Sequence, residues 1–246
     1  MRANLLFANT CKQIAWLKES LTQKRSVLAC KITMSVLLLL GWFVSHATAQ
    51  NGTEKNWVAG EINTEFSRVF IFVDKAGLVG HQHAVEGRLK DGHLVINDDK
   101  KSSITFDMKS FDADTPLARK YLSIQSEIDE ETRKKVNENM LGLEILSVEH
   151  YPEATLKNVK WKPTGKTSKR NLPEYLLEGN FTLHKTTRPI QAVCDAELKD
   201  GWLHVRGAFR ILQSDYRIKP FSKMMGTVGV KDELRIYGDL WVVPAS

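Results

Sequence analysis

Cysteine is scarce in this sequence. The 246 residues include three cysteines, and only Cys194 lies beyond the first 49 residues. A single cysteine cannot form an internal disulfide, so residues 50–246 need a hydrophobic core rather than a disulfide framework. Nothing near Cys194 in the sequence favours a thiolate. We therefore interpret Cys194 as a small buried hydrophobic residue.

A strong charge of one sign is missing from most of the chain. The whole sequence has 35 Lys and Arg against 29 Asp and Glu, but residues 1–49 hold six of the basic residues and one of the acidic ones. The remainder therefore carries 29 basic and 28 acidic side chains, a net charge of +1. A nucleic-acid surface needs a basic face that neutralises several phosphates. We expect no nucleic-acid partner.

Sequence motifs of the common enzyme classes are also absent. The chain has no G-x-S-x-G nucleophile motif, no glycine-rich phosphate loop and no C-x-x-C pair. Asp112 and Asp114 lie close together, but a strand end and a helix cap explain them. We expect a protein without catalytic activity and without a cofactor.

No apolar run is long enough to span a bilayer comfortably, since a spanning helix needs about 20 such residues. A shorter run covers residues 32–44, after several basic residues and before small residues at 47–49. This order predicts a signal peptide over residues 1–49, with cleavage before Gln50 and export of the remaining chain. A retained membrane anchor is the alternative, because the basic region before the run is unusually long.

Short segments with alternating apolar and polar residues fill most of residues 57–240. Their spacing is typical of an antiparallel sandwich or barrel. The clearest case is a hairpin over residues 177–198, in which Leu177, Phe181 and Leu183 share an apolar face. Other strands are predicted at residues 57–63, 66–73, 78–89, 93–96, 102–109, 154–161, 203–211 and 234–240.

Several turns are predicted from their residue types. Residues 185–188 connect the hairpin, and Pro189 begins its second strand, where proline removes no ladder hydrogen bond. Asp-Gly pairs at 91–92 and 200–201 are strong two-residue hairpin signals. The lysine-rich residues 162–173 are predicted to form a solvated loop, and a contact with phosphate or with an anionic membrane is the alternative.

The alternation stops at Asp114-Thr115-Pro116, where a cap residue followed by proline indicates a helix start. Residues 116–146 instead show apolar side chains three and four positions apart. We expect one or two helices here, lying across one end of the sheet. The side chains that recur at this spacing form a stripe along the helix, which consists of Ile128, Thr132, Val136, Met140 and Leu143.

In its order and spacing of short motifs, the chain resembles the YceI-like family of exported bacterial lipid-binding proteins. The resemblance covers nearly all of residues 50–246 and depends on the motifs together. They are Phe66-Ser67-Arg68-Val69-Phe70, Val85-Glu86-Gly87-Arg88-Leu89, Ser110-Phe111-Asp112, Tyr151-Pro152-Glu153-Ala154-Thr155, Gly179-Asn180-Phe181-Thr182-Leu183-His184, Thr187-Arg188-Pro189 and Ser214-Asp215-Tyr216.

The resemblance implies a fold, a location and a ligand. The fold is a mainly β, lipocalin-like antiparallel barrel of about eight strands, here with one or two inserted helices, formed by residues 50–246. The location is the periplasm or the exterior of the cell. The ligand is a polyisoprenoid, an isoprenoid quinone or a fatty amphiphile held inside the barrel. Transient contact with a membrane and assembly of a homodimer are further expectations.

The apolar faces of the predicted strands indicate which residues would bind such a ligand. Glycines at 87, 179, 207 and 238 leave room for a narrow lumen among larger side chains. The alternative is a core filled by its own side chains, as in many small barrels. The predicted ligand-binding residues are Phe70, Phe72, Val85, Phe106, Met108, Met140, Leu143, Phe181, Leu183, Phe209 and Ile211.

His81 and His83 support a different function. Residues i and i+2 of a strand face the same side, so both imidazoles can reach one metal ion. The alternative hypothesis is therefore a metal-binding protein or metal-dependent enzyme. Its further ligands are not identified, since Glu61, His93, Asp112 and Asp114 qualify by residue type only. Otherwise we expect the two histidines to lie at the entrance of the barrel.

Overall fold

A computed structural model of the chain describes residues 55–77, 79–95 and 102–244. The predicted signal peptide over residues 1–49 lies outside this range. Among the described residues, no helix is both long and apolar enough to cross a membrane.

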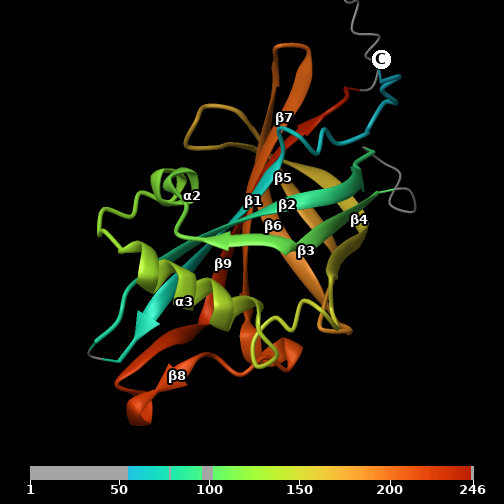
Figure 1. Ribbon diagram of the computed structural model, residues 1–246. Helices are drawn as coiled ribbons and strands as arrows, with labels where there is room; N and C mark the ends of the chain where they lie inside the picture. Colours follow the sequence, from blue (N-terminus) through green and yellow to red (C-terminus); the bar gives the residue numbers. More distant parts are fainter. Residues whose placement is uncertain (1–54, 78, 96–101, 245–246) are drawn as a thin grey trace, which may run out of the picture. The chain divides into compact units, whose positions relative to one another are not determined.

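Antiparallel strands form most of the described chain. Eight long strands pair in the order β1-β2-β3-β4-β5-β6-β7-β9, and β9 pairs back with β1 to close the ring. The short β8 pairs only with β9. The predicted antiparallel barrel of about eight strands is confirmed (Figure 1). The strands are β1 (Arg68–Ala76), β2 (His83–His93), β3 (Ser103–Ala113), β4 (Glu153–Thr167), β5 (Pro173–Leu183), β6 (Thr186–Lys199), β7 (Trp202–Leu212), β8 (Ser222–Lys223) and β9 (Val228–Val242).

Two α-helices, α2 (Pro116–Tyr121) and α3 (Glu130–Leu141), lie between β3 and β4. The Thr115 hydroxyl caps α2 by accepting the Ala118 N–H at 3.1 Å, with proline at the first helical turn as predicted. The Asp129 carboxylate caps α3 by accepting the Thr132 N–H at 2.8 Å. Helix α2 packs on β2 and α3 packs on β3 (Figure 1).

The connections differ from several predictions. The β5–β6 turn is His184-Lys185, and both residues have positive φ, as a two-residue hairpin turn requires. Pro189 consequently lies within β6, opposite Asn180. Asp200-Gly201 forms the predicted turn between β6 and β7. Asp91-Gly92 does not form a turn, because β2 continues through both residues to His93.

The predictions of a strand at residues 57–63 and of a loop at residues 162–173 were also wrong. Residues 57–63 form no strand and make only isolated bridges, Glu61 with His93 and Ile62 with Val242. Most of residues 162–173 belong to strands rather than to a loop, because β4 extends to Thr167 and β5 starts at Pro173. Most side chains of residues 162–167 are exposed, which accounts for the polar composition of this part of β4.

The core occupies the inside of the barrel. Inward residues of every long strand form one continuous apolar cluster, which includes Phe181, Ile211 and Ile236. A separate small cluster lies outside the barrel, where Phe70 and Ala84 pack beneath α2. The barrel therefore has an apolar interior and one apolar patch on its outer face.

Candidate binding cavity

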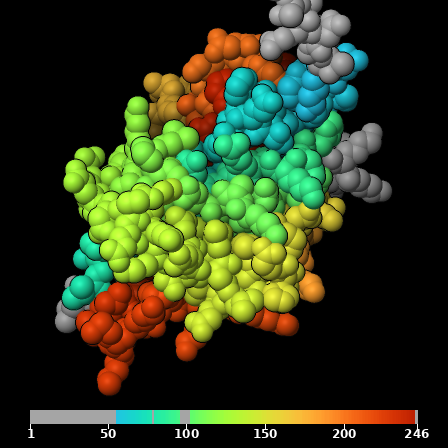
Figure 2. All heavy atoms as spheres, in the orientation of Figure 1, coloured from blue at the N-terminus to red at the C-terminus, as the bar shows by residue number. Residues whose placement is uncertain are grey.

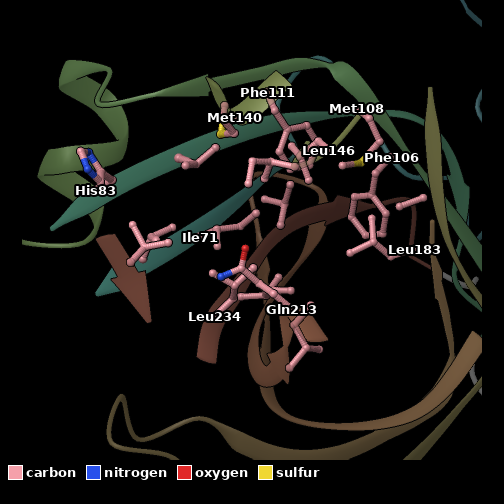
Figure 3. A pocket seen from close by; sticks show the side chains of 18 of the residues that line it. Ile71, His83, Phe106, Met108, Phe111, Met140, Leu146, Leu183, Gln213 and Leu234 are labelled. Carbon is pink, nitrogen blue, oxygen red and sulfur yellow. The ribbon is translucent and has the colours of Figure 1, made fainter. Parts of the chain in front are cut away.

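An apolar cavity lies inside the barrel, between the strands and α3. It encloses about 160 Å³, and inward side chains of β1, β2, β3, β5, β7 and β9 form its wall (Figure 3). Volume of this size is many times what one water molecule needs. The hypothesis of a completely filled core is therefore wrong for this structure.

A second, smaller hollow of about 60 Å³ continues along the barrel interior. Its lining shares Val69, Phe106, Phe209 and Ile236 with the first cavity. The paired glycines Gly207 and Gly238 of β7 and β9 line it. A Cβ at Gly238 would come no closer than 3.8 Å to another side chain, so this glycine leaves open space, whereas Cys194 already fills the position beside Gly207. The first cavity and this hollow together form one passage through the barrel. We call the first the wide cavity and the second the deep hollow.

Aromatic rings form the part of the wall between the two hollows. The Phe181 ring lies edge-on to the Phe106 ring at 6.2 Å and to the Phe209 ring at 5.7 Å. These rings give a large apolar contact area with few rotatable bonds. The side chains on this wall are suited to an apolar partner and offer no hydrogen bonds.

Eight of the predicted ligand-binding residues lie on the cavity wall. They are Val85, Phe106, Met108, Met140, Phe181, Leu183, Phe209 and Ile211. Alternation placed the strand residues correctly, because each of these strands has one apolar and one more polar face. Whether these eight residues bind a ligand stays a prediction.

Phe70 and Phe72 were wrongly predicted to line the cavity. The inward residues of β1 are Val69, Ile71 and Val73. Phe70 points outward and stacks on Tyr121 of α2, with ring centroids 3.9 Å apart. The segment from Val69 to Val73 is apolar throughout, so periodicity could not decide which face turns inward.

Leu143 was also wrongly predicted to face the cavity. Helix α3 ends at Leu141, and Gly142 has an extended backbone. The helical spacing that predicted the stripe therefore no longer applies at Leu143, whose side chain is 72% exposed. Within the stripe, Val136 and Met140 do reach the cavity.

Among the described residues that line the cavity, three are polar, His83, Asn139 and Gln213. Gln213 is 4% exposed, and its side-chain amide donates to the Lys231 carbonyl at 2.8 Å. This bond identifies the nitrogen, so the other atom of the carboxamide is the oxygen. The oxygen has no hydrogen-bond partner among the described residues and points toward the opposite wall (Figure 3). Sequence reasoning gave no signal for Gln213.

His83 is held at the edge of the cavity by a buried carboxylate. Its Nδ1 lies 2.7 Å from Oδ2 of Asp114, while Oδ1 of Asp114 accepts hydrogen bonds from Arg119 and from the Ala84 N–H. Burial of Asp114 opposes its ionisation, but the hydrogen bonds from His83, Ala84 and Arg119 outweigh it and lower the pKa of the carboxyl group. His83 is therefore part of a fixed polar network.

His81 does not join His83 at a metal site. The His81 side chain is exposed and does not line the cavity, whereas His83 does. In the described parts of the chain, no group of three or more His, Cys, Asp or Glu residues could hold a metal ion. Of the two histidines, only His83 lies at the cavity.

Cys194 is buried on the inward face of β6 and lines the deep hollow. Burial raises the pKa of its thiol to about 12, with a smaller contribution from the neighbouring carboxylates of Asp195 and Glu174. A thiol with this pKa is protonated at neutral pH and does not act as a nucleophile. The interpretation of Cys194 as a small buried hydrophobic residue is confirmed.

Known structures with a similar fold have little sequence identity to this chain. Burkholderia cenocepacia BcnA is 16% identical, with a TM-score of 0.47 over 74% of this chain and 99% of its own. A polyisoprenoid binding domain from Saccharophagus degradans is 13% identical, with a TM-score of 0.47 over 76% and 100% of the two chains. A Campylobacter jejuni YceI protein mutant is 16% identical, with a TM-score of 0.42 over 65% and 85%.

The family of the chain follows from its sequence. Comparison with curated proteins finds no match. The family model of the YceI-like domain, in contrast, matches residues 61–240, which include every long strand of the barrel and both helices. Because this match covers well over half of the sequence, the chain belongs to the YceI-like family.

Proposed function

We propose that this protein is an exported, non-catalytic carrier that holds one long apolar molecule inside its barrel. The observation that carries the proposal is the cavity itself, whose described lining residues are apolar except for His83, Asn139 and Gln213. Burial of apolar ligand surface supplies about 25 cal/mol per Å², so such a wall can hold a hydrocarbon chain without a charged anchor. A polyisoprenoid or isoprenoid quinone is the first ligand class, and a fatty amide or acid is the second.

The shape of the interior supports a slender ligand. The wide cavity is followed by the deep hollow beside Gly207 and Gly238, and the two share four lining residues. An unbranched or methyl-branched chain fits a passage of this kind better than a compact ring system does. We place the chain end of the ligand in the deep hollow and its head in the wide cavity.

The polar end of the ligand would lie near Gln213. The Gln213 oxygen is an acceptor that faces the cavity without a partner among the described residues, so a ligand that covers it without donating a hydrogen bond would lose free energy. A ligand hydroxyl or amide N–H at this point would satisfy it. This favours a head group that donates one hydrogen bond, such as that of a polyprenol, a hydroquinone or a fatty amide.

A pair of aspartate substitutions tests the proposal. Phe209→Asp puts an unpaired charge on the cavity wall, and this should abolish retention of isoprenoids. Phe72→Asp is the matched control, because Phe72 lies on the outer face of β1 beneath Arg235. Ligand retention is measured by lipid extraction of each purified variant, and circular dichroism establishes that its sheet is intact.

The two variants should differ strongly. Retention in Phe72→Asp at the wild-type level, with none in a folded Phe209→Asp, is the expected result. Equal retention in both folded variants would contradict binding inside the barrel. If Phe209→Asp does not fold, Phe209→Ser tests the same wall position with a smaller polar group.

A further inference from the structure

A loop beside the cavity exposes two neighbouring methionines. Residues 217–231, which we call the methionine loop, contain β8, the short 3₁₀ helix η2 (Met224–Gly226) and the first four residues of β9. Met224 is 74% exposed and Met225 is 107% exposed. Both have positive φ, a backbone conformation that costs non-glycine residues free energy. Neighbouring large apolar side chains that project into solvent are typical of a site that contacts another molecule.

The methionine loop is also part of the cavity wall. Phe221 and Val230, within the loop, line the wide cavity. Val79, 59% exposed, bridges to Val228, and its N–H donates to the Thr227 carbonyl at 3.2 Å. The red segment that contains β8 projects at the lower edge of the view (Figure 2). The exposed methionines thus lie close to one end of the cavity.

The charges of this loop have a single sign. It contains Arg217, Lys219, Lys223 and Lys231 and no acidic residue. Lys231 pairs with Asp74 at 2.8 Å. Within the described residues, the other three cations have no carboxylate partner, and Lys223 lies over the Phe221 ring at 5.2 Å. Acidic residues flank the loop at Asp215, Asp232 and Glu233, so the positive charge is concentrated within residues 217–223.

Exposed apolar side chains beside cations without carboxylate partners are suited to bind an anionic bilayer surface. The methionines would enter the boundary between head groups and acyl chains, while the cations contact the phosphates. An acidic protein surface would attract the same cations, but it would not accept two projecting apolar side chains unless it had a matching pocket. A lipid surface needs no such pocket.

We propose that the methionine loop docks this protein on anionic lipid surfaces, so that the cavity end beside the loop faces the bilayer that supplies or receives the ligand. This proposal rests on the proposed function for its purpose, since a carrier of membrane lipids must reach a membrane. The docking surface itself is defined by exposed apolar and basic residues and does not depend on the ligand.

Vesicle co-sedimentation tests the proposal. The protein, purified from its own host, is mixed with vesicles of phosphatidylcholine alone or of phosphatidylcholine with phosphatidylglycerol. We expect binding only to the second kind, weakened by added salt. The double variant Lys219→Glu with Lys223→Glu should lower the partition coefficient by at least about fivefold for each cation. Met224→Ser with Met225→Ser should also lower it strongly.

Matched controls separate the loop from general surface effects. Lys166→Glu with Lys169→Glu makes the same charge change at the end of β4 and in the turn that follows it. Val193→Ser with Leu198→Ser removes two exposed apolar side chains of β6, which lie on opposite faces of the strand. Both control pairs should bind vesicles like the wild type. The proposal is overturned if the wild type does not bind anionic vesicles, or if loop and control variants lose binding equally.

Isoprenoid titration without vesicles separates this proposal from the proposed function. The loop variants should bind isoprenoid like the wild type, since their changed side chains do not line the cavity. Vesicle binding without isoprenoid binding would overturn the carrier function and leave the docking surface. Isoprenoid binding with no effect of the loop variants on vesicle binding would overturn the docking surface alone.

Discussion

Asp114 is a buried acidic residue at the edge of the cavity. Its side chain is 1% exposed and contacts His83 and Arg119, each at 2.7 Å. Its positive φ suits an aspartate or asparagine. Asparagine at this position would therefore keep the backbone but leave the Arg119 charge without its partner.

Asp114→Asn should lower the free energy of unfolding by about 3 kcal/mol at neutral pH, because it breaks a buried ion pair. The folded pKa of Asp114 lies below its ordinary value of 3.8. The stabilisation is therefore complete above that pH and is lost as the pH falls through the lowered pKa. Urea unfolding of both proteins at several pH values measures this difference.

Asp112→Asn is the control for this prediction. Asp112 pairs with Arg133, but its side chain is 42% exposed, so the loss should stay below about 1 kcal/mol. Equal losses for the two variants, or a difference that does not shrink in acid, would show that the Asp114 carboxylate does not stabilise the fold through its charge.

Gln213 tests the position of the ligand head group. Gln213→Leu replaces the side chain by an apolar one of similar size, which removes the acceptor oxygen and also the amide that donates to the Lys231 carbonyl. Affinity for a polyprenol should fall about fivefold to tenfold, the value of one hydrogen bond. Affinity for the matching hydrocarbon should not fall. Fluorescence titration with both ligands measures this, and an equal fall for both would place the head group elsewhere.

At the level of elements, alternation predicted the inner face only where a strand has one apolar face. It succeeded for Phe181 and Leu183 in β5 because their neighbours are polar. It failed for β1, where Phe70 is buried on the outer face by α2, a tertiary contact that the strand sequence does not reveal. The Asp91-Gly92 turn signal failed for a related reason, since irregular pairing of β2 with β3 at this point carries the strand onward.

Strand β9 also controls the depth of the passage. A Cβ added at Gly238 would come no closer than 3.8 Å to another side chain, so a larger residue fits there. Gly238→Leu should fill the deep hollow and weaken binding of long polyprenols, while short ones still bind. The measurement is a titration with polyprenols of increasing length.

Val193→Leu is the control, because it enlarges an exposed side chain on the outer face of β6. It should leave the dependence of affinity on chain length as in the wild type. If Gly238→Leu also left it unchanged, the chain end of the ligand would not reach the deep hollow.

At the level of the whole molecule, pairing of β1 with β9 joins the two ends of the sheet. The ring removes free sheet edges and encloses the cavity. Strand number and antiparallel pairing could be predicted from the sequence, because they follow from alternation and family motifs. The polar lining at Gln213 and the exposed methionine loop could not, since both depend on how distant segments meet.

The central claim is that one long apolar molecule occupies the barrel. Native mass spectrometry of the wild-type protein, gently purified from its own host, tests this most directly and also detects bound metal. We predict one isoprenoid or fatty amphiphile per chain, which organic extraction removes. Protein that carries no lipid from its host, and binds none when titrated with isoprenoids, would contradict the account.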